Sequence, residues 1–357
     1  MSHVDVSVIR QRPGMFIGDT ADGSGLVHMV WELVANSLDQ HLAGRCTRID
    51  VHLEQDGSVV VEDDGPGIPL VDVGGRPFAE VALTRFHATP TFDGHAPHEH
   101  VGGGLHGVGL FPLNALSSLL VVDVFRDGFR HTQRFQRGLA VSGMEKVGPA
   151  TRTGTRVLLQ PDPAIFSDTW INAGTIATRL RELACLLPAL TLTFQDRREH
   201  VFREPRGLIA FLERTRRELV PVASALVLDE VVGDIRVEAA VEWHASRWST
   251  VESYANVERT TDGGTHVQGL IEGLAEGLGD AAPAWKTRPQ KRLVESVSRG
   301  LHAIVCVRLL DPTYGAPTKS RLVTPEAKSA VSSAVRATFG PFLRRNGALL
   351  DHFAGAP

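Results

Sequence analysis

Residues 25–39 carry the feature that most constrains the fold, an apolar row and a polar row at helical spacing. At about 100° per residue, Glu32, Asn36 and Asp39 fall within roughly 60° of one another on a helix. The opposite side gathers Val27, Val30, Trp31, Val34 and Leu38. We expect an amphipathic helix that packs on a core and presents a carboxylate and amide row outward. Such a row is usually a solvated face, so by itself it assigns no chemistry.

The next segment predicts a β-hairpin whose second strand ends in an acidic turn. Residues 49–53 and 58–61 have strand character, and the Asp56-Gly57 pair between them is typical of a tight turn. The second strand leads into residues 62–67, Glu-Asp-Asp-Gly-Pro-Gly. A strand therefore delivers carboxylates into a glycine turn. Asp63 is either a functional group there or an ordinary turn residue.

A glycine-rich loop precedes the helix that we predict at residues 110–116. Its backbone N–H groups can approach phosphate oxygens, and the helix N-terminus that follows favours an anion. The loop is not a Walker A motif, because it lacks the Gly-Lys-Ser/Thr ending, and no strand directly precedes it as in a Rossmann fingerprint. A plain surface loop is the alternative. Its residues are Gly102, Gly103, Gly104, Leu105, His106, Gly107, Val108 and Gly109.

The remaining pattern predicts a mixed sheet with helices and then a second α/β domain. We expect an extended segment and turn at residues 10–15, and a charged boundary at 196–205 divides the chain into domains 1–205 and 206–357. A last helix at 325–339 is expected to stop at Gly340-Pro341. The other predicted helices cover 80–86, 171–187, 207–219 and 265–278, and the other strands cover 119–125, 130–136, 155–160, 190–195, 225–232, 236–243 and 301–310.

Composition excludes several classes of protein. The 357 residues suffice for about two domains, and 37 basic against 41 acidic residues give a net charge of −4, unlike a protein that binds nucleic acid with its whole surface. Three distant cysteines argue against a disulfide framework and a zinc site. No targeting segment opens the chain, and no apolar run approaches the roughly 18 residues that span a bilayer. We expect a soluble cytoplasmic protein without membrane contact.

One histidine-rich segment suggests a metal site. His95, His98, Glu99 and His100 lie close together in the sequence, before the glycine-rich loop. Imidazole and carboxylate groups are common metal ligands. A mobile polar loop is the interpretation that we favour, because residues 87–100, which include this segment, contain Pro90, Gly94 and Pro97.

The order of these motifs resembles that of the GHKL ATPases, the superfamily of gyrase, histidine kinases and mismatch-repair ATPases. Several further motifs resemble the B subunits of DNA gyrase and topoisomerase IV, in order along essentially the whole chain. They are Arg12-Pro13-Gly14-Met15-Phe16-Ile17-Gly18-Asp19-Thr20, Asp63-Asp64-Gly65-Pro66-Gly67-Ile68-Pro69, Gly103-Gly104-Leu105-His106-Gly107-Val108-Gly109, Asp262-Gly263-Gly264-Thr265-His266 and Thr318-Lys319. The resemblance implies an α/β fold, an α+β two-layer GHKL (Bergerat) domain with a mixed sheet, followed by a smaller α/β transducer domain.

The resemblance also implies roles for single residues. Glu32 would be the general base for the water that attacks the γ-phosphate of ATP, and His28 would hold that carboxylate. Asn36 would ligate Mg²⁺. Asp63 would accept the adenine amino group, and residues 102–109 would wrap the phosphates with backbone N–H groups. Further nucleotide contacts would come from Thr155, Gly67 and Ile68, and Lys319 of the second domain would reach the γ-phosphate.

The sequence departs from the family pattern at several positions. Ala35 stands where an acid is usual, and Gln40 and Pro66 replace both members of an ion pair, whereas Arg126 is kept. Two lid lysines are replaced by Thr91 and His100, and a glutamine by Pro317. We therefore expect a weaker positive grip on phosphate.

The resemblance implies partners as well. ATP-coupled homodimerisation is expected through the N-terminal domain, although the N-terminal arm is shorter than in the family. The metal-binding cleavage domain and the DNA-cleaving tyrosine context have no counterpart here, so we expect gyrase-like subunits to supply cleavage and this chain to contact DNA weakly or indirectly. A stand-alone ATP-switched regulator and a decoy with little turnover remain alternatives.

Overall fold

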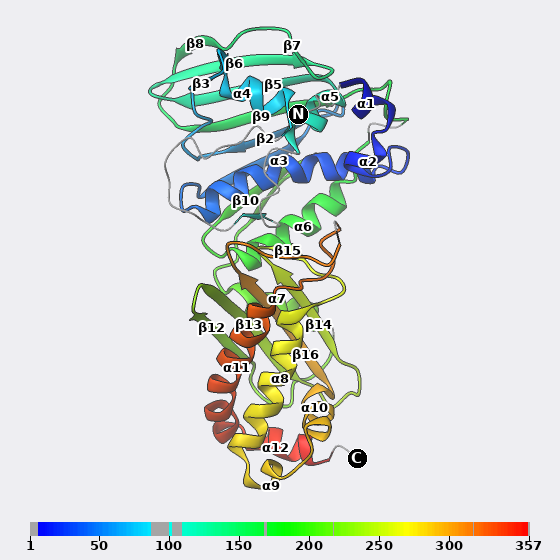
Figure 1. The fold of residues 1–357 in the computed structure, drawn as a ribbon, viewed down its shortest axis with the longest axis vertical. Helices are drawn as coiled ribbons and strands as arrows, with labels where there is room; N and C mark the ends of the chain where they lie inside the picture. The colour runs from blue at the N-terminus through cyan, green and yellow to red at the C-terminus, as the bar shows by residue number, and fades with distance from the viewer. Residues whose placement is uncertain are drawn as a thin grey trace. The chain divides into compact units, whose positions relative to one another are not determined.

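The computed structural model describes residues 6–86, 100–101, 109–167, 170–216, 218–316 and 318–355. It divides the chain into two compact units. Unit 1 comprises Met1–His98 and Leu105–Arg203, and unit 2 comprises Glu99–Gly104 and Glu204–Pro357. Figure 1 shows both units and labels most of their elements. No helix among these described ranges is both long and apolar enough to cross a bilayer.

Unit 1 contains, among its described residues, a nine-stranded mixed sheet in the order β11-β10-β1-β2-β9-β5-β6-β7, with β8 paired to β6. The predicted hairpin forms as expected, because β1 and β2 pair antiparallel with Ile49 opposite Asp63. The β1–β10 pair is parallel, which makes the sheet mixed. The main strands are β1 (Arg48–Leu53), β2 (Val59–Asp63), β5 (Ser117–Arg126), β6 (Phe129–Gln136), β7 (Leu139–Ala140), β8 (Glu145–Pro149), β9 (Gly154–Pro161), β10 (Thr191–Gln195) and β11 (Glu199–Phe202), and a separate small pair joins β3 (Asp72–Val73) and β4 (Arg76–Pro77).

A layer of helices packs on this sheet. Helix α3 (Ser24–Leu42) contacts β1, β2 and α5 (Leu110–Ala115), and α6 (Ala173–Leu186) contacts β10 and β11. Helix α4 (Phe78–Thr84) packs beside α5. The predicted apolar side of α3 is only partly right, because Val30, Val34 and Leu38 are buried while Val27 and Trp31 are half-buried. Leu26, Met29 and Leu33 are buried instead, since the side of the helix that they occupy contacts the sheet and α5.

The prediction of an extended segment at residues 10–15 is wrong. Two short helices, α1 (Val6–Gln11) and α2 (Gly14–Ile17), occupy this region on either side of Pro13. Ile9 is completely buried, and the Phe16 ring stacks on Phe86 with centroids 5.9 Å apart. Tertiary burial of these side chains stabilises helices that are too short to form alone.

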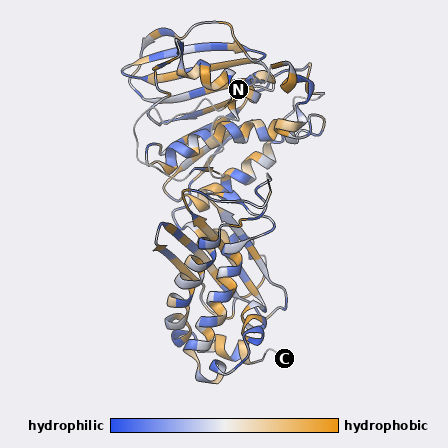
Figure 2. Cartoon of the chain, viewed as in Figure 1, coloured by the Kyte–Doolittle hydropathy of each residue, from blue (hydrophilic) through white to orange (hydrophobic). Residues whose placement is uncertain are grey.

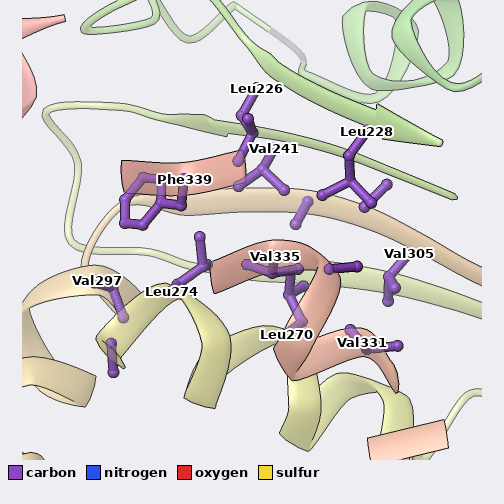
Figure 3. Packing of buried hydrophobic residues seen from close by; sticks show 14 of the residues in the cluster. Leu226, Leu228, Val241, Leu270, Leu274, Val297, Val305, Val331, Val335 and Phe339 are labelled. Carbon is purple, nitrogen blue, oxygen red and sulfur yellow. The ribbon is translucent and has the colours of Figure 1, made fainter. Parts of the chain in front are cut away.

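Unit 2 contains, within its described part, a five-stranded sheet in the order β12-β13-β16-β14-β15. Helices α8 (Thr265–Ala281) and α11 (Pro325–Arg345) cover one face, and α7 (Gly207–Thr215) contacts β13 and β16 on the other. Figure 3 shows apolar side chains of α8 and α11 directed toward those of the sheet. In Figure 2 the strands are mostly hydrophobic, whereas these two helices mix hydrophobic and hydrophilic residues. The strands are β12 (Leu226–Val232), β13 (Ile235–Trp243), β14 (Thr250–Ala255), β15 (Glu258–Arg259) and β16 (Leu301–Arg308), and the remaining helices are α9 (Pro283–Lys286), α10 (Gln290–Ser298) and α12 (Gly347–Ala354).

Glycines at four-residue spacing let α8 and α11 approach closely. A Cβ atom at Gly273 would lie 2.6 Å from the Ser332 carbonyl oxygen, and one at Gly277 would lie 3.1 Å from the Phe339 ring. Helix α11 also continues past Gly340-Pro341, contrary to the predicted stop. Phe342 and Leu343 are buried beyond that point, and burial of each such side chain contributes about 1.5–3 kcal/mol, which offsets the roughly 3 kcal/mol cost of an internal proline.

Candidate functional site

The polar row of α3 lies at the surface of unit 1. The Glu32 side chain is 34 % exposed, and its Oε1 lies 3.5 Å from Nε2 of His28, one turn earlier. Asn36 is exposed, and its Nδ2 donates a hydrogen bond to the Glu32 carbonyl. Because the amide nitrogen makes this bond, the Asn36 oxygen remains available to a cation. Asp39 is half-buried on the same helix.

The Glu32 carboxylate lies against the start of α5. A Cβ atom at Gly109, the N-cap of α5, would overlap Oε2 of Glu32, so this close approach depends on glycine. Gly109 is the last residue of the predicted phosphate loop. The other predicted loop residues, Gly102 to Val108, lie outside the described residues, as do His95, His98 and Glu99 of the histidine-rich segment.

Asp63 ends β2 as a buried carboxylate with three hydrogen-bond donors. Ser37 Oγ donates to Oδ2 at 2.9 Å, and the backbone N–H groups of Gly65 and Thr155 donate to Oδ1 at 2.9 and 3.3 Å. Burial raises the pKa of the Asp63 carboxyl above its usual value, although the three hydrogen bonds act in the opposite direction. The Ser37 bond ties Asp63 to α3, so Asp63 lies beside the helix that carries Glu32 and Asn36.

Sequence reasoning did not find Ser37. It lies on the buried side of α3, next to Asn36, where a serine has no motif that distinguishes it from a packing residue. The signal that was available is its polarity at a position that the apolar pattern assigns to the core. A buried hydroxyl needs a partner, and here the partner is a carboxylate.

Close backbone contacts shape the turn around Asp63. Gly154 has φ 138°, and a Cβ atom there would overlap the Asp63 carbonyl oxygen. Gly67 has φ 77°, and its Cβ would lie 2.9 Å from the Phe125 carbonyl oxygen. Only glycine fits both positions without strain. Thr155 follows Gly154 at the start of β9, and Ile68 is half-buried beside Gly67.

Arg126 holds this turn through backbone carbonyls. Its Nη1 donates to the Gly67 oxygen at 2.8 Å and to the Pro66 oxygen at 3.4 Å. The Gln40 side chain lies against Gly65, since a Cβ atom there would be 3.6 Å from Gln40 Cβ and Cγ. Gln40 and Pro66 carry no charge and form no ion pair, so the described contacts that hold this turn include those of the Arg126 guanidinium with the Pro66 and Gly67 carbonyls.

Two motifs of unit 2 come together around Lys319. The N–H of Asp262 donates to the Ser320 carbonyl at 2.7 Å, and Ser320 Oγ donates to Asp262 Oδ2 at 2.6 Å. A Cβ atom at Gly264 would overlap the Leu322 carbonyl. Lys319 itself has a left-handed φ of 56°. The Asp262-Gly263-Gly264 turn thus fixes the loop that carries Lys319, and the role of Lys319 at the γ-phosphate stays a prediction.

Comparison with known proteins identifies the family. Residues 21–163 match the family described as histidine kinase-, DNA gyrase B- and HSP90-like ATPase, and residues 207–354 match the family described as DNA gyrase B. The crystal structure of the 43K ATPase domain of Thermus thermophilus gyrase B, in complex with an aminocoumarin, is 32% identical and has a TM-score of 0.83. The match covers 98% of this chain and 93% of that one. The chain belongs to the DNA gyrase B family.

This gyrase B-like chain spans about half the length of the curated relatives that it matches. The DNA gyrase B protein of Halalkalibacterium halodurans is 38% identical over 350 residues, which are 95% of this chain and 54% of the relative. The gyrase B protein of Thermotoga maritima is 38% identical over 344 residues, or 92% and 54%. The topoisomerase IV ATP-binding domain of Francisella tularensis shares the fold, with a TM-score of 0.81 at 23% identity. The ATPase family and the mixed α/β fold predicted from the sequence are confirmed.

Proposed function

We propose that unit 1 binds ATP with Mg²⁺ and hydrolyses it, with Glu32 as the general base. The observation that carries this proposal is the Ser37–Asp63 hydrogen bond, which sets a buried carboxylate beside the helix of Glu32 and Asn36. A family match to ATPases over residues 21–163 supports it. Asp63, the proposed recognition group for the adenine base, and Glu32, the proposed water-activating group, thus lie on neighbouring elements.

Asp63 recognises the adenine amino group. An ionised carboxylate offers about four lone-pair sites, and Ser37, Gly65 and Thr155 use three of them. The remaining site accepts one N–H of an exocyclic amine. Burial makes that bond selective, because a base without the amino group would leave the fourth site of the carboxylate without a donor. Thr155, Gly67 and Ile68 surround this position as nucleotide contacts.

Asn36 fits the hard oxygen ligand that Mg²⁺ prefers, because its amide oxygen is exposed and its nitrogen is bound to the Glu32 carbonyl. Mg²⁺ usually takes one or two protein oxygens together with phosphate oxygens and water, so a single amide is a fitting donor set. When bound, the ion would neutralise charge on the phosphates. The backbone of residues 102–109 would donate N–H groups to them.

Glu32 orients and deprotonates the attacking water, and His28 limits the movement of its carboxylate from one turn away. The water oxygen forms the new bond to the γ-phosphorus while the bond to the β-phosphate oxygen breaks, and Glu32 takes the proton. Lys319 would stabilise the charge that develops on the γ-phosphoryl oxygens.

Glu32→Gln separates turnover from binding. The amide keeps the size of the side chain but cannot take a proton, so we expect the ATPase rate to fall by about 10²–10⁴-fold. Binding of a non-hydrolysable ATP analogue, measured by calorimetry with and without Mg²⁺, should stay close to that of the parent. Glu54→Gln, at an exposed position after β1, is the matched control. An unchanged ATPase rate in Glu32→Gln would remove Glu32 from the mechanism.

Asp63→Asn tests base recognition. We expect it to weaken ATP binding far more than GTP binding, because adenine carries an amino group at C6 where guanine has a carbonyl oxygen. Asp64→Asn is the control, since Asp64 instead accepts from the backbone N–H groups of Thr47 and Arg48. Equal losses for both nucleotides would contradict the assignment of Asp63.

For the biological role, we propose that this chain is the ATPase part of a type II topoisomerase system and acts with gyrase-like subunits that carry DNA cleavage. Association of two copies on ATP binding is part of the proposal. ATPase activity should rise when supercoiled DNA and gyrase A-type subunits are added together. Gel filtration should show a dimer when the ATP analogue is present. A monomer both with and without the analogue would contradict the association.

A further inference from the structure

Three potential metal ligands meet under α7 in unit 2. Glu242 on β13 is paired directly with His302 on β16, so their side chains share one face of the sheet. His244 lies two residues after Glu242, on the same face, and its backbone N–H donates to the Gly300 carbonyl. The alternate residues, Trp243 and Leu301, belong to the apolar core on the opposite face.

The three side chains are close together and excluded from solvent. His244 Nε2 and His302 Nδ1 each lie 3.1 Å from the same oxygen, Oε1 of Glu242. One ligand atom from each residue lies within 4.8 Å of the others. Glu242 is 0 %, His244 1 % and His302 4 % exposed. Groups of this kind are seldom buried together unless a cation or a hydrogen-bond network compensates them.

Protein hydrogen bonds do not satisfy His244. Within the described part of the chain, neither of its buried ring nitrogens has a hydrogen-bond partner, although Nε2 faces Glu242. Leaving such a group unpaired costs about 1–3 kcal/mol. A cation placed between His244 and Glu242 would remove that cost.

The surroundings of His302 favour the same conclusion. Its Nε2 lies 3.1 Å from Thr215 Oγ1, and that hydroxyl donates to the Phe211 carbonyl at 2.9 Å. A hydroxyl that donates to a carbonyl accepts from the histidine, so the proton of His302 belongs on Nε2. The lone pair of Nδ1 then faces a carboxylate oxygen 3.1 Å away, and two acceptors in this position need a positive charge between them.

We propose that Glu242, His244 and His302 bind a Zn²⁺ ion that joins β13 to β16. Two imidazoles and one carboxylate form a three-ligand set known for zinc, with the fourth position left to water. Thr215 would act as the partner of the second nitrogen of a ligating histidine, an arrangement that fixes ring orientation. Arg216 binds both oxygens of Glu242 at 2.9 and 2.7 Å and orients the carboxylate. The proposal is independent of the ATPase mechanism.

A proton is the competing occupant, because a protonated histidine would also bridge to Glu242. Zinc binding and protonation predict different measurements. The full chain, without a histidine tag and after chelator treatment and dialysis, is titrated with ZnCl₂ by calorimetry, and bound zinc is measured by mass spectrometry. Co²⁺ is then substituted, since a tetrahedral nitrogen and oxygen site gives strong visible absorption.

We expect one zinc per chain and a tetrahedral Co²⁺ spectrum. His244→Ala and His302→Gln should each weaken zinc binding by more than the roughly 10–100-fold that loss of an outer partner causes. His302→Gln retains a group that can bond Thr215, which protects the fold. The control variant His95→Ala/His98→Ala replaces two histidines of the histidine-rich segment, which lies outside the proposed site. It should still bind one zinc per chain.

Several results would overturn the proposal. They are no zinc retention by the parent, zinc retention unchanged in His244→Ala and His302→Gln, and loss of zinc only in the His95→Ala/His98→Ala control. If both ligand variants fail to unfold cooperatively, the parent's Co²⁺ spectrum decides, and an octahedral spectrum refutes the site. A pH-dependent stability without any response to zinc would identify the occupant as a proton.

Discussion

Ser37→Ala is the sharpest test of the candidate site, because it removes one hydrogen bond to a buried charge. Ser37 Oγ donates to Asp63 Oδ2 at 2.9 Å, and Asp63 is 7 % exposed. A hydrogen bond to a charged group contributes about 1.5–3 kcal/mol. In a unit of this size each kcal/mol of lost stability lowers Tm by roughly 2–4 °C, so the Tm of unit 1 should fall by about 3–12 °C.

Ser117→Ala provides a matched control in the same unit. Ser117 is completely buried, and its Oγ donates to the neutral Leu113 carbonyl at 2.6 Å. Loss of a neutral bond costs about 0.5–1.5 kcal/mol, so calorimetry should show a smaller decrease in Tm. A decrease in Ser37→Ala no larger than in Ser117→Ala would refute an ionised, Ser37-bonded Asp63.

The pH dependence of this comparison adds a second readout. Ser37 stabilises the ionised form of Asp63, while burial raises the Asp63 pKa. A protonated Asp63 has less need of a donor, so the cost of Ser37→Ala should decrease as the pH falls through the Asp63 pKa. The cost of Ser117→Ala should not change with pH. A cost of Ser37→Ala that stays constant across the whole pH titration would contradict the role of the charge.

Three further predictions concern the stability of the two units. Burial lowers the pKa of His266 to about 4, whereas the histidine of the unfolded chain binds its proton near 6.5. The free energy of unfolding should therefore fall by about 3 kcal/mol as the pH drops from 6.5 to 4. Urea titrations should find this loss in the parent and not in His266→Gln. Gly154→Ala should destabilise unit 1 by about 2 kcal/mol or more in denaturant titrations, whereas Gly148→Ala, which has open space, should change stability by under about 0.5 kcal/mol. Gly273→Ala should melt below Gly279→Ala, because its Cβ meets the Ser332 carbonyl at 2.6 Å while that of Gly279 meets only Leu293 at 3.5 Å; the reverse order would contradict tight α8–α11 packing.

Much of the local structure was predictable from periodicity and turn residues. The β1–β2 hairpin follows from its alternating strands and Asp56-Gly57, and α3 follows from its 3.6-residue pattern. The same reasoning failed at residues 10–15 and at Gly340-Pro341. At residues 10–15, burial against distant side chains stabilised two short helices on either side of Pro13. At Gly340-Pro341, such burial outweighed the local preference of proline to end a helix.

Glu32, Asn36 and Asp63 could be proposed because each lies in a short motif whose spacing suggests its chemistry. Ser37 could not, since its partner Asp63 is 26 residues away in the sequence. Glu242 and His302 are 60 residues apart and become neighbours only through the register of β13 and β16. Spacing along the chain carries no signal for such pairs.

The sequence alone therefore determined the ATPase-like motifs, the element types and the polar row on α3, because these depend on neighbours within a few residues. Tertiary structure decided which polar groups are buried and with whom. It joined Ser37 to Asp63, set Glu32 against Gly109, and brought two histidines to one carboxylate. Burial and electrostatic pairing depend on distances through space, and strand register and helix packing set those distances.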